Sequence, residues 1–478
     1  MLRTPFPAKP RNARRILRTW GLLILLTSIL AGCDALPDTI RLDQRDAPEA
    51  IPATGEPEAT IAPEPTETLP PGVTAIVFWE PFPLDRPQGL LLAEMIRDFE
   101  VENPDLMVKT VAKNGYPGIH DAMLAEMPDG ELPDLAVAFP SMIAQYAAAG
   151  LVAPLDTYVN DPEIGLTDED LVDIFPVYLN AAQLPGFGRQ IMAFPFVQNA
   201  IGMWVNGTLL AQAGWDHAPT TWAEFEQACF DVSARTGVGC YPFVESVTTF
   251  NAWLYSRGGQ QLDNSGQRAA FNSPAGVESL ALLRRLIDAG LAWRPESPYG
   301  DYIAFANGQA SFAFSSTGNS QLYEDAYDGA LRSGMAPFHW YQTLIPQADP
   351  EQPATTLYGA SFFVIQGDPA REEAAWRLIR WFTDRDQTAR WAAELQAMPV
   401  RVSALEVMTE TLAAHPFVLA QVEEVLPYGK PEPAVAAELE VRDILYTAIV
   451  SVTQNLADPQ IALDHAAIEA NTVLAGQQ

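Results

Sequence analysis

Lysine is scarce in this chain of 478 residues, where 60 acidic residues stand against 28 basic ones for a formal net charge of −32. The only lysines are Lys9, Lys109, Lys113 and Lys430. Nucleic acids and anionic bilayer surfaces both bind basic patches, so the strongly negative net charge argues against both as partners. A hydrophobic content of 48% predicts a globular body, and solubility accounts for the acidity.

Motifs that carry catalysis or bind metals are also missing. The five histidines are scattered and form no HExxH pair: His120, His217, His339, His415 and His465. The chain has no GxSxG nucleophile elbow, no P-loop and no zinc-ligand spacing. Carboxylate pairs can be found among 60 acids, but none sits in a recognisable glycoside-hydrolase motif. We therefore predict that the protein is not an enzyme and needs no metal or cofactor.

Cysteine occurs three times, at Cys33, Cys229 and Cys240. In an oxidising compartment Cys229 and Cys240 are close enough in sequence to form a disulfide around the turn at 235–237. A loop of this size contributes roughly 2–3 kcal/mol in the chain-entropy model. We predict a structural role for this pair, because no histidine lies near it to complete a metal site.

The N-terminus has the composition of an export signal. Six basic residues precede Cys33 with no acid among them, and an apolar run at 21–30 is too short for a comfortable membrane span. Leu30-Ala31-Gly32-Cys33 resembles the bacterial lipoprotein signal. That resemblance implies that residues 1–32 are removed and that Cys33 carries the lipid. An ordinary signal peptide or an uncleaved anchor is the alternative, and each of the three places the body outside the cytoplasm, on the outer face of the membrane.

Residues 33–72 read as a tether. Seven prolines and five glutamates fall between residues 47 and 71, with almost no large apolar side chain. Such a segment buries too little surface to offset its ordering entropy.

Alternating strand and helix signals open the body of the protein. Apolar strands are predicted at 74–79, 106–111 and 132–139, with amphipathic helices between them. This alternation predicts parallel βαβ units in an α/β sheet. Because open α/β sheets bind ligands at the carboxyl ends of their strands, we expect Trp79-Glu80, Gly115-Tyr116 and Phe139-Pro140 to rim a site.

The later part of the chain carries sharper local signals. Residues 194–199 lead into a strand at 201–206, and Thr221 and Glu224 have the spacing of a capping box. A further strand is predicted at 358–365, followed by a helix at 369–382 that begins with Asp368-Pro369. Asp458-Pro459 begins the last predicted helix.

These segments, in this order, resemble the family-1 (carbohydrate-type) extracellular solute-binding proteins of bacterial ABC importers. The most specific matches are 194–206 and 219–225 (Pro-Thr-Thr-Trp-Ala-Glu-Phe), and the resemblance spans nearly all of 73–478. It implies a type II periplasmic-binding-protein-like α/β fold, in which two lobes are joined by crossing hinge strands and hold the ligand between them. The expected lobes are 73–195 plus about 337–398, and 196–336 plus about 399–478.

Within that family the chain is similar to the maltose and glycerol-3-phosphate branches. The resemblance implies that Tyr116 corresponds to a ligand-contacting tyrosine of the family. It also implies that Ser316 or Thr317, and Gly359, correspond to further ligand-contacting positions. Three charged or polar ligand residues of the glycerol-phosphate type are replaced here by Pro140, Ala397 and Pro427. These replacements favour a neutral sugar or oligosaccharide over a glycerol phosphate.

Sugar recognition needs aromatic faces for the C–H side of the ring and planar polar groups for its hydroxyls. The candidates for stacking are Trp79, Tyr116, Trp253 and Trp340. The candidates for hydrogen bonding are Glu80, Gln198, Asn199, Asn251, Arg257 and Ser316. Core packing is the alternative role for each aromatic residue.

The sequence therefore predicts a monomeric, membrane-tethered binding protein that captures a sugar and delivers it to the permease subunits of an ABC importer. A glycerol-3-phosphate or polyol binder and a ligand-binding sensor subunit are the alternatives. An exported carbohydrate-active enzyme is the rival class.

Overall fold

The computed structural model describes residues 70–127, 130–184, 186–188, 190–297 and 299–476. The predicted signal peptide, the predicted lipidation site Cys33 and nearly all of the predicted tether lie outside the described residues. Within the described ranges, no helix is both long enough and apolar enough to cross a bilayer.

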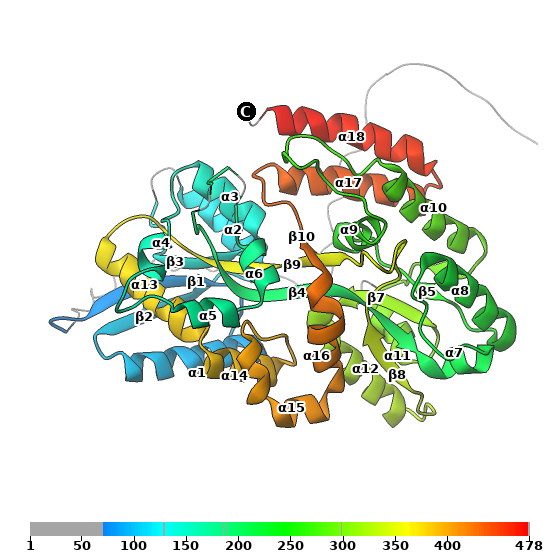
Figure 1. The fold of residues 1–478 in the computed structure, drawn as a ribbon, viewed down its shortest axis with the longest axis horizontal. Coiled ribbons are helices and arrows are strands. Elements are labelled where there is room, and N and C mark those ends of the chain that lie inside the picture. The colour runs from blue at the N-terminus through cyan, green and yellow to red at the C-terminus, as the bar shows by residue number, and fades with distance from the viewer. Residues whose placement is uncertain (1–69, 128–129, 185, 189, 298, 477–478) are drawn as a thin grey trace, which may run out of the picture. The chain divides into compact units, whose positions relative to one another are not determined.

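Ten strands and eighteen α-helices make up the described part of the chain (Figure 1). The strands are β1 (Thr74–Glu80), β2 (Leu106–Ala112), β3 (Leu135–Ala138), β4 (Phe194–Asn206), β5 (Tyr241–Pro242), β6 (Ala292–Trp293), β7 (Phe312–Ser316), β8 (Trp340–Thr343), β9 (Thr355–Val364) and β10 (Gly429–Pro431). The helices up to the middle of the chain are α1 (Pro87–Glu102), α2 (Gly115–Glu126), α3 (Pro140–Ala148), α4 (Asp156–Val159), α5 (Asp168–Asp173), α6 (Pro176–Ala181), α7 (Gly207–Ala213), α8 (Trp222–Thr236) and α9 (Val247–Tyr255). The later helices are α10 (Pro274–Asp288), α11 (Gly300–Ala306), α12 (Ser320–Arg332), α13 (Pro369–Phe382), α14 (Arg385–Leu395), α15 (Thr409–Ala414), α16 (Pro416–Ala420), α17 (Glu438–Thr453) and α18 (Pro459–Ala475).

The first lobe is the part of the protein that surrounds the hydrophobic core formed around β1, β2 and β3. These strands are parallel, with β1 between the other two, as the βαβ pattern predicts. The apolar stripe of α1 is buried against them through Leu92, Met95 and Phe99. Pro133, which has no N–H to donate, precedes β3, and this strand is shorter than the sequence predicts.

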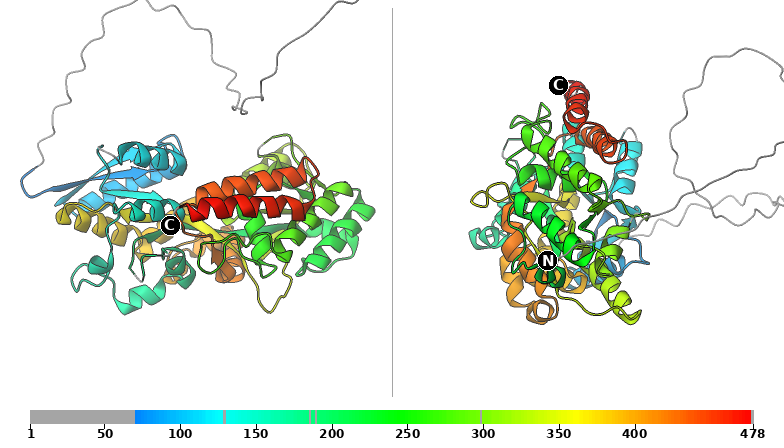
Figure 2. Two further views of the ribbon diagram at one scale, coloured as in Figure 1. Left: turned by 90° about the horizontal axis from the view of Figure 1, so that it is seen from above. Right: turned by 90° about the vertical axis from the view of Figure 1, so that its right-hand side faces the viewer.

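The second lobe contains further hydrophobic core, built mainly from the helices α7 to α12, α17 and α18. The predicted capping box is confirmed at the start of α8, where the side chains of Thr221 and Glu224 each accept a hydrogen bond from the other's backbone N–H. Asp458 caps α18, also as predicted, and α17 and α18 pack side by side (Figure 2). Cys229 and Cys240 are joined by a buried disulfide with their Cα atoms 5.0 Å apart.

Two long strands connect the lobes (Figure 1). Residues 194–200 of β4 pair with β9, and residues 201–206 pair with β7 and β8 in the second lobe. The far half of β9 returns to the first lobe and pairs with β3. Both β4–β9 and β3–β9 are antiparallel, so the sheet combines the predicted parallel βαβ units with strands of the opposite direction. A strand that returns from the other lobe must run against the strands it joins.

The lobe boundaries given by the sequence stay a prediction. In the structure, β8 pairs with the second-lobe half of β4, and Ile345 packs into the core around Trp222 and Phe225. These contacts place 340–345 with the second lobe.

Gly359 lets β9 cross β4 at close range. A Cβ atom there would collide with the carbonyl oxygen of Val197 and would lie 2.7 Å from the Cα of Gln198.

We predict that Gly359→Ala lowers the free energy of unfolding by about 1–3 kcal/mol, because the clash is with backbone. Urea denaturation measures this loss, with Gly367→Ala as the control, since a Cβ there meets nothing within 4 Å. Equal stabilities of the two variants would contradict the prediction.

Candidate functional site

A cavity of about 300 Å³ lies between the two lobes, against the crossing strands. The first lobe contributes Pro117, Ala181 and residues 139–142 to its wall. The crossing strands contribute Gln198 and 357–359, and the second lobe contributes Thr248 and the start of α17. Its volume falls at the lower end of the range of small-molecule sites, about 300–1,000 Å³.

Local sequence explains how the first-lobe wall reaches the cavity. β3 ends at Ala138, and Pro140 occupies the first position of α3, where its missing N–H costs nothing. The wall residue Phe139 is packed from behind by Tyr116, with ring centroids 4.9 Å apart. Phe139 and Pro140 thus line a cavity at the carboxyl end of their strand, and their part in a ligand site stays a prediction.

A set of buried and partly buried polar side chains, which we call the cleft network, lies at the second-lobe wall, and four of its six members line the cavity. Its members are Thr248, Asn251, Gln261, Glu432, Glu438 and Arg442. Asn251 Nδ2 donates to Gln261 Oε1 (2.7 Å) and to Glu432 Oε1 (3.1 Å). Gln261 Nε2 donates to Glu438 Oε1 (2.6 Å). Arg442 lies 2.7 Å from Glu432 Oε1 and donates to Thr248 Oγ1 (2.9 Å).

The charges in the cleft network nearly cancel. Burial raises the pKa of Glu438 to about 8, and the neighbouring Glu432 adds to this effect, while the Gln261 hydrogen bond and Arg442 oppose it. At neutral pH Glu438 is therefore mostly a neutral acid that can donate a proton to a hydrogen bond. The single positive charge of Arg442 is then balanced by Glu432.

Several buried polar atoms at this site lack protein partners. Gln198 Nε2 donates to the carbonyl of Ala360 (3.2 Å), but Gln198 Oε1 has no hydrogen-bond partner among the described residues. The same holds, within those residues, for Asn251 Oδ1 and Glu438 Oε2. An unsatisfied buried acceptor costs about 1–3 kcal/mol, and a ligand hydroxyl relieves that cost. The arrangement is therefore suited to a neutral ligand that both donates and accepts hydrogen bonds.

Three residues predicted from the sequence come together here. Gln198 and Gly359 line the cavity, and Asn251 belongs to the cleft network. Tyr116 stands one layer behind, against Phe139. Their contacts with a ligand stay a prediction.

Other predicted residues lie at the first-lobe end of the strands or at the crossing. Trp79 is buried in the first-lobe core, with the Lys113 ammonium 3.8 Å from its ring centre. Glu80 is buried beside it, and burial raises its pKa while its bond from the Phe82 N–H lowers it. Asn199 pairs with β9. Ser316 Oγ accepts from the N–H of Gly318, and Thr317 Oγ1 accepts from the N–H of Ala200.

The remaining predicted residues pack inside the second lobe. Trp253 lies among Trp222, Phe225 and Phe314, and the Arg257 guanidinium covers the Trp222 ring at 3.9 Å. Trp340 packs against Trp204. In this arrangement none of the three lines the cavity between the lobes.

Sequence reasoning missed most of the cleft network. Glu432, Glu438 and Arg442 fall in a Pro-rich segment and at the start of a helix, where charges are typically solvated. Glu438 and Arg442 are four residues apart, which on sequence alone indicates a surface ion pair. Only the packing of α17 against α9 and α3 buries them.

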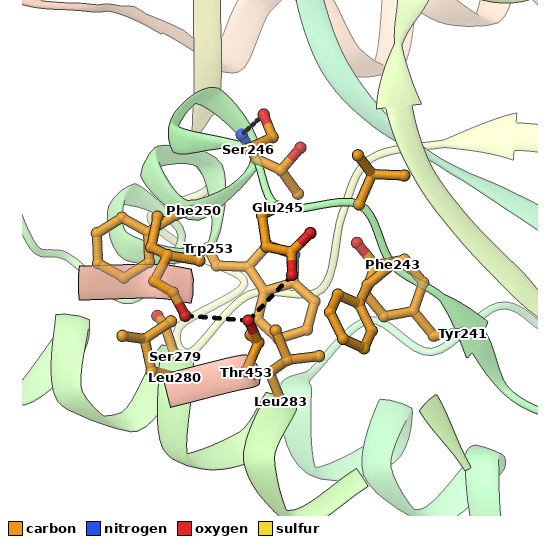
Figure 3. A pocket seen from close by; sticks show the side chains of 13 residues that line it. Tyr241, Phe243, Glu245, Ser246, Phe250, Trp253, Ser279, Leu280, Leu283 and Thr453 are labelled. Carbon is orange, nitrogen blue, oxygen red and sulfur yellow. Dashed lines mark hydrogen bonds between the residues drawn. The ribbon is translucent and has the colours of Figure 1, made fainter. Parts of the chain in front are cut away.

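A second cavity, drawn in Figure 3, lies within the second lobe beside Trp253 and has a volume of only about 30 Å³. Its Glu245 accepts hydrogen bonds from Thr453 (3.1 Å) and Gln454 (2.8 Å) and pairs with Arg294 at 3.1 Å. The space holds about one water molecule, and its carboxylate is already satisfied. This cavity is therefore a weaker candidate for a ligand site than the cavity between the lobes.

The lobes, the crossing strands and the cavity between them define the class of protein: a binding protein of the type II periplasmic fold. The family model for bacterial extracellular solute-binding proteins matches residues 94–418. The chain belongs to that family.

Two solved structures and one curated relative resemble the chain at low identity. A binding protein of Brucella abortus (strain 2308) is 22% identical over 399 residues, covering 81% of this chain and 90% of the relative. The sugar-binding protein MalE from Xanthomonas citri superposes with a TM-score of 0.72 at 19% identity, covering 84% of this chain and 98% of MalE. UgpB from Mycobacterium tuberculosis, in complex with glycerophosphocholine, gives 0.68 at 20% identity, covering 85% of this chain and all of UgpB (100%). At these identities the structures establish the fold.

The raised pKa of Glu438 makes stability depend on pH. In the unfolded chain this carboxyl titrates near 4.5, and in the fold near 8, so between these values the folded state binds more protons. Its contribution to stability is therefore complete below about pH 4.5 and is lost as the pH rises through 8, by up to about 1.4 kcal/mol per pH unit. We predict that Glu438→Gln becomes progressively more stable than the native chain from pH 5 to 8.

Chemical denaturation at four pH values measures this difference. Glu440→Gln is the control, because Glu440 is exposed on the same helix. A Glu438→Gln difference that does not change with pH would contradict the assignment of a neutral buried acid.

Proposed function

We propose that this protein captures a small neutral carbohydrate in the cavity between its lobes. The observation that carries the proposal is a cavity wall on which Gln198 and Glu438 each have an oxygen, Gln198 Oε1 and Glu438 Oε2, without a hydrogen-bond partner among the described residues. A sugar hydroxyl both donates and accepts, so it can pair with either group. Apolar wall residues such as Phe139 and Leu357 suit the C–H faces of a ring.

The charge of the cavity favours a neutral ligand over a phosphate. Arg442 is its cationic wall residue, and that charge is paired with Glu432 at 2.7 Å. A phosphate would have to compete with this carboxylate, and it would lie beside Glu438 as well. The similar MalE of Xanthomonas citri is a sugar-binding protein, which supports the same proposal.

Capture followed by delivery is the proposed mechanism. Ligand contacts on both lobes favour the closed arrangement, because differential affinity shifts an open–closed equilibrium. The crossing strands β4 and β9 are the proposed hinge. The closed protein would then dock on the permease of an ABC importer, with a lipid on Cys33 keeping it on the outer face of the membrane. No chemistry on the sugar is proposed.

The first test is thermal unfolding of the purified protein with neutral mono- and oligosaccharides, polyols and glycerol phosphates. A ligand at 100 times its dissociation constant adds about 2.7 kcal/mol to the free energy of unfolding. We expect a shift with a neutral sugar that is recovered unaltered. A shift with glycerol phosphates alone would overturn the neutral-ligand proposal, and conversion of the sugar would overturn the binding role. Loss of uptake of that sugar in a deletion strain tests delivery, against a purely sensory role.

Gln198 supplies the matched mutational test. Gln198→Met keeps the shape of the side chain but removes the acceptor, so we predict a dissociation constant raised about 5- to 50-fold, from the loss of one buried hydrogen bond. Calorimetric titration measures it, with Gln227→Met, exposed on α8, as the control. An unchanged affinity in Gln198→Met would exclude Gln198 as a ligand contact.

A further inference from the structure

Glu438 is a buried acid on the wall of the cavity between the lobes. The residue keeps only 1% of its surface exposed, yet it lines that cavity. Its Oε1 accepts one hydrogen bond, from Gln261 Nε2 at 2.6 Å, and its Oε2 has no partner among the described residues. The only donor bonded to this carboxyl within the described residues is therefore a neutral amide.

The one positive charge of the cleft network lies beside the other carboxylate. Glu432 Oε1 is 2.7 Å from Arg442 and accepts from Asn251 at 3.1 Å. In contrast, the described residues place no arginine, lysine or histidine within 4.0 Å of the Glu438 carboxyl. When two buried carboxyls share one cation, the one without the cation retains its proton most strongly. This geometry agrees with the pKa of Glu438, which burial raises to about 8.

Besides Glu432 and Arg442, the titratable groups around Glu438 are tyrosines. Burial raises the pKa of Tyr255, on α9, well above its ordinary value and that of Tyr358, on β9, to about 12. From the first lobe, α3 packs against α17 and carries no acidic or basic side chain. On α10 and α18, which also pack against α17, the charged side chains are exposed or paired elsewhere. Glu438 is therefore the wall group that we expect to change its charge between pH 6 and 9.

Resting on the proposed function, we propose that Glu438 stays protonated in the sugar complex, so that capture of the sugar is coupled to this proton. A protonated Oε2 can donate to the ring and glycosidic oxygens of a sugar, which accept hydrogen bonds but cannot donate them. The sugar also displaces water from the cavity, and loss of water disfavours an ionised carboxylate further. Both effects have the same sign: ionisation of Glu438 weakens binding, and binding to the ionised form takes up a proton.

Calorimetric titration of the full-length protein from pH 6 to pH 9 tests this coupling. The probes are glucose, maltose, cellobiose and xylobiose, and we expect at least one of them to bind. Because only the protonated fraction binds well, its dissociation constant is expected to change little from pH 6 to 7 and to rise at least about fivefold from pH 7 to 9. At pH 8, titrations in phosphate and in Tris are expected to report uptake of about half a proton per sugar bound.

The variant Glu438→Gln assigns the proton to this residue. Its amide retains a donor but does not titrate, so the pH dependence and the proton uptake are both expected to disappear. Glu440→Gln, exposed on the same helix, is the control and is expected to keep the native pH profile. A pH dependence that survives in Glu438→Gln would overturn the assignment.

The native protein tests the coupling without any variant. A probe that binds equally well from pH 6 to 9, or more tightly at pH 9, would refute the proton coupling and leave the proposed function intact. Absence of proton uptake at pH 8 would refute it in the same way. Binding of no probe at any pH would refute both.

Discussion

The antiparallel pairing of β4 with β9 is the interaction on which the cleft depends. These two strands are buried at both ends, in the first-lobe core through residues such as Phe196 and Phe362 and in the second-lobe core through residues such as Met203. The backbone ladder between them fixes the side of the crossing on which Gln198 and Gly359 face the cavity. Because Gly359 has no side chain, the strands approach closely at that point.

The second constraint is the burial of charge. Desolvating Glu432, Glu438 and Arg442 is costly unless each is paired or neutralised. The structure meets this requirement with one ion pair, one protonated acid and the amides of Asn251 and Gln261. Among the described residues, the same arrangement leaves Glu438 Oε2 at the cavity wall without a hydrogen-bond partner. Stability and ligand recognition therefore draw on one set of side chains, which is why a variant such as Glu438→Gln is expected to affect both.

Several helices could be predicted because their signals are local. The apolar stripe of α1 in the first lobe, the capping box of α8 in the second lobe and the proline after Asp368 each act within one or two turns. The site was less accessible to sequence reasoning. Trp253 and Trp340 are of the residue type that stacks on sugar rings, yet they pack among other aromatic rings. Aromatic residues serve cores and binding sites equally well, and only their neighbours distinguish the two uses.

The sequence by itself determined the family, through the resemblance of its segments, and the strands and helices of the βαβ units, because periodicity, caps and turn residues act within short segments. Tertiary structure alone decided that β9 runs antiparallel to β3, that Glu432 meets Asn251 and that Glu438 meets Gln261. Those contacts join residues 170 or more positions apart. Burial at that range depends on how α17 packs against the rest of the protein, and no local pattern encodes it.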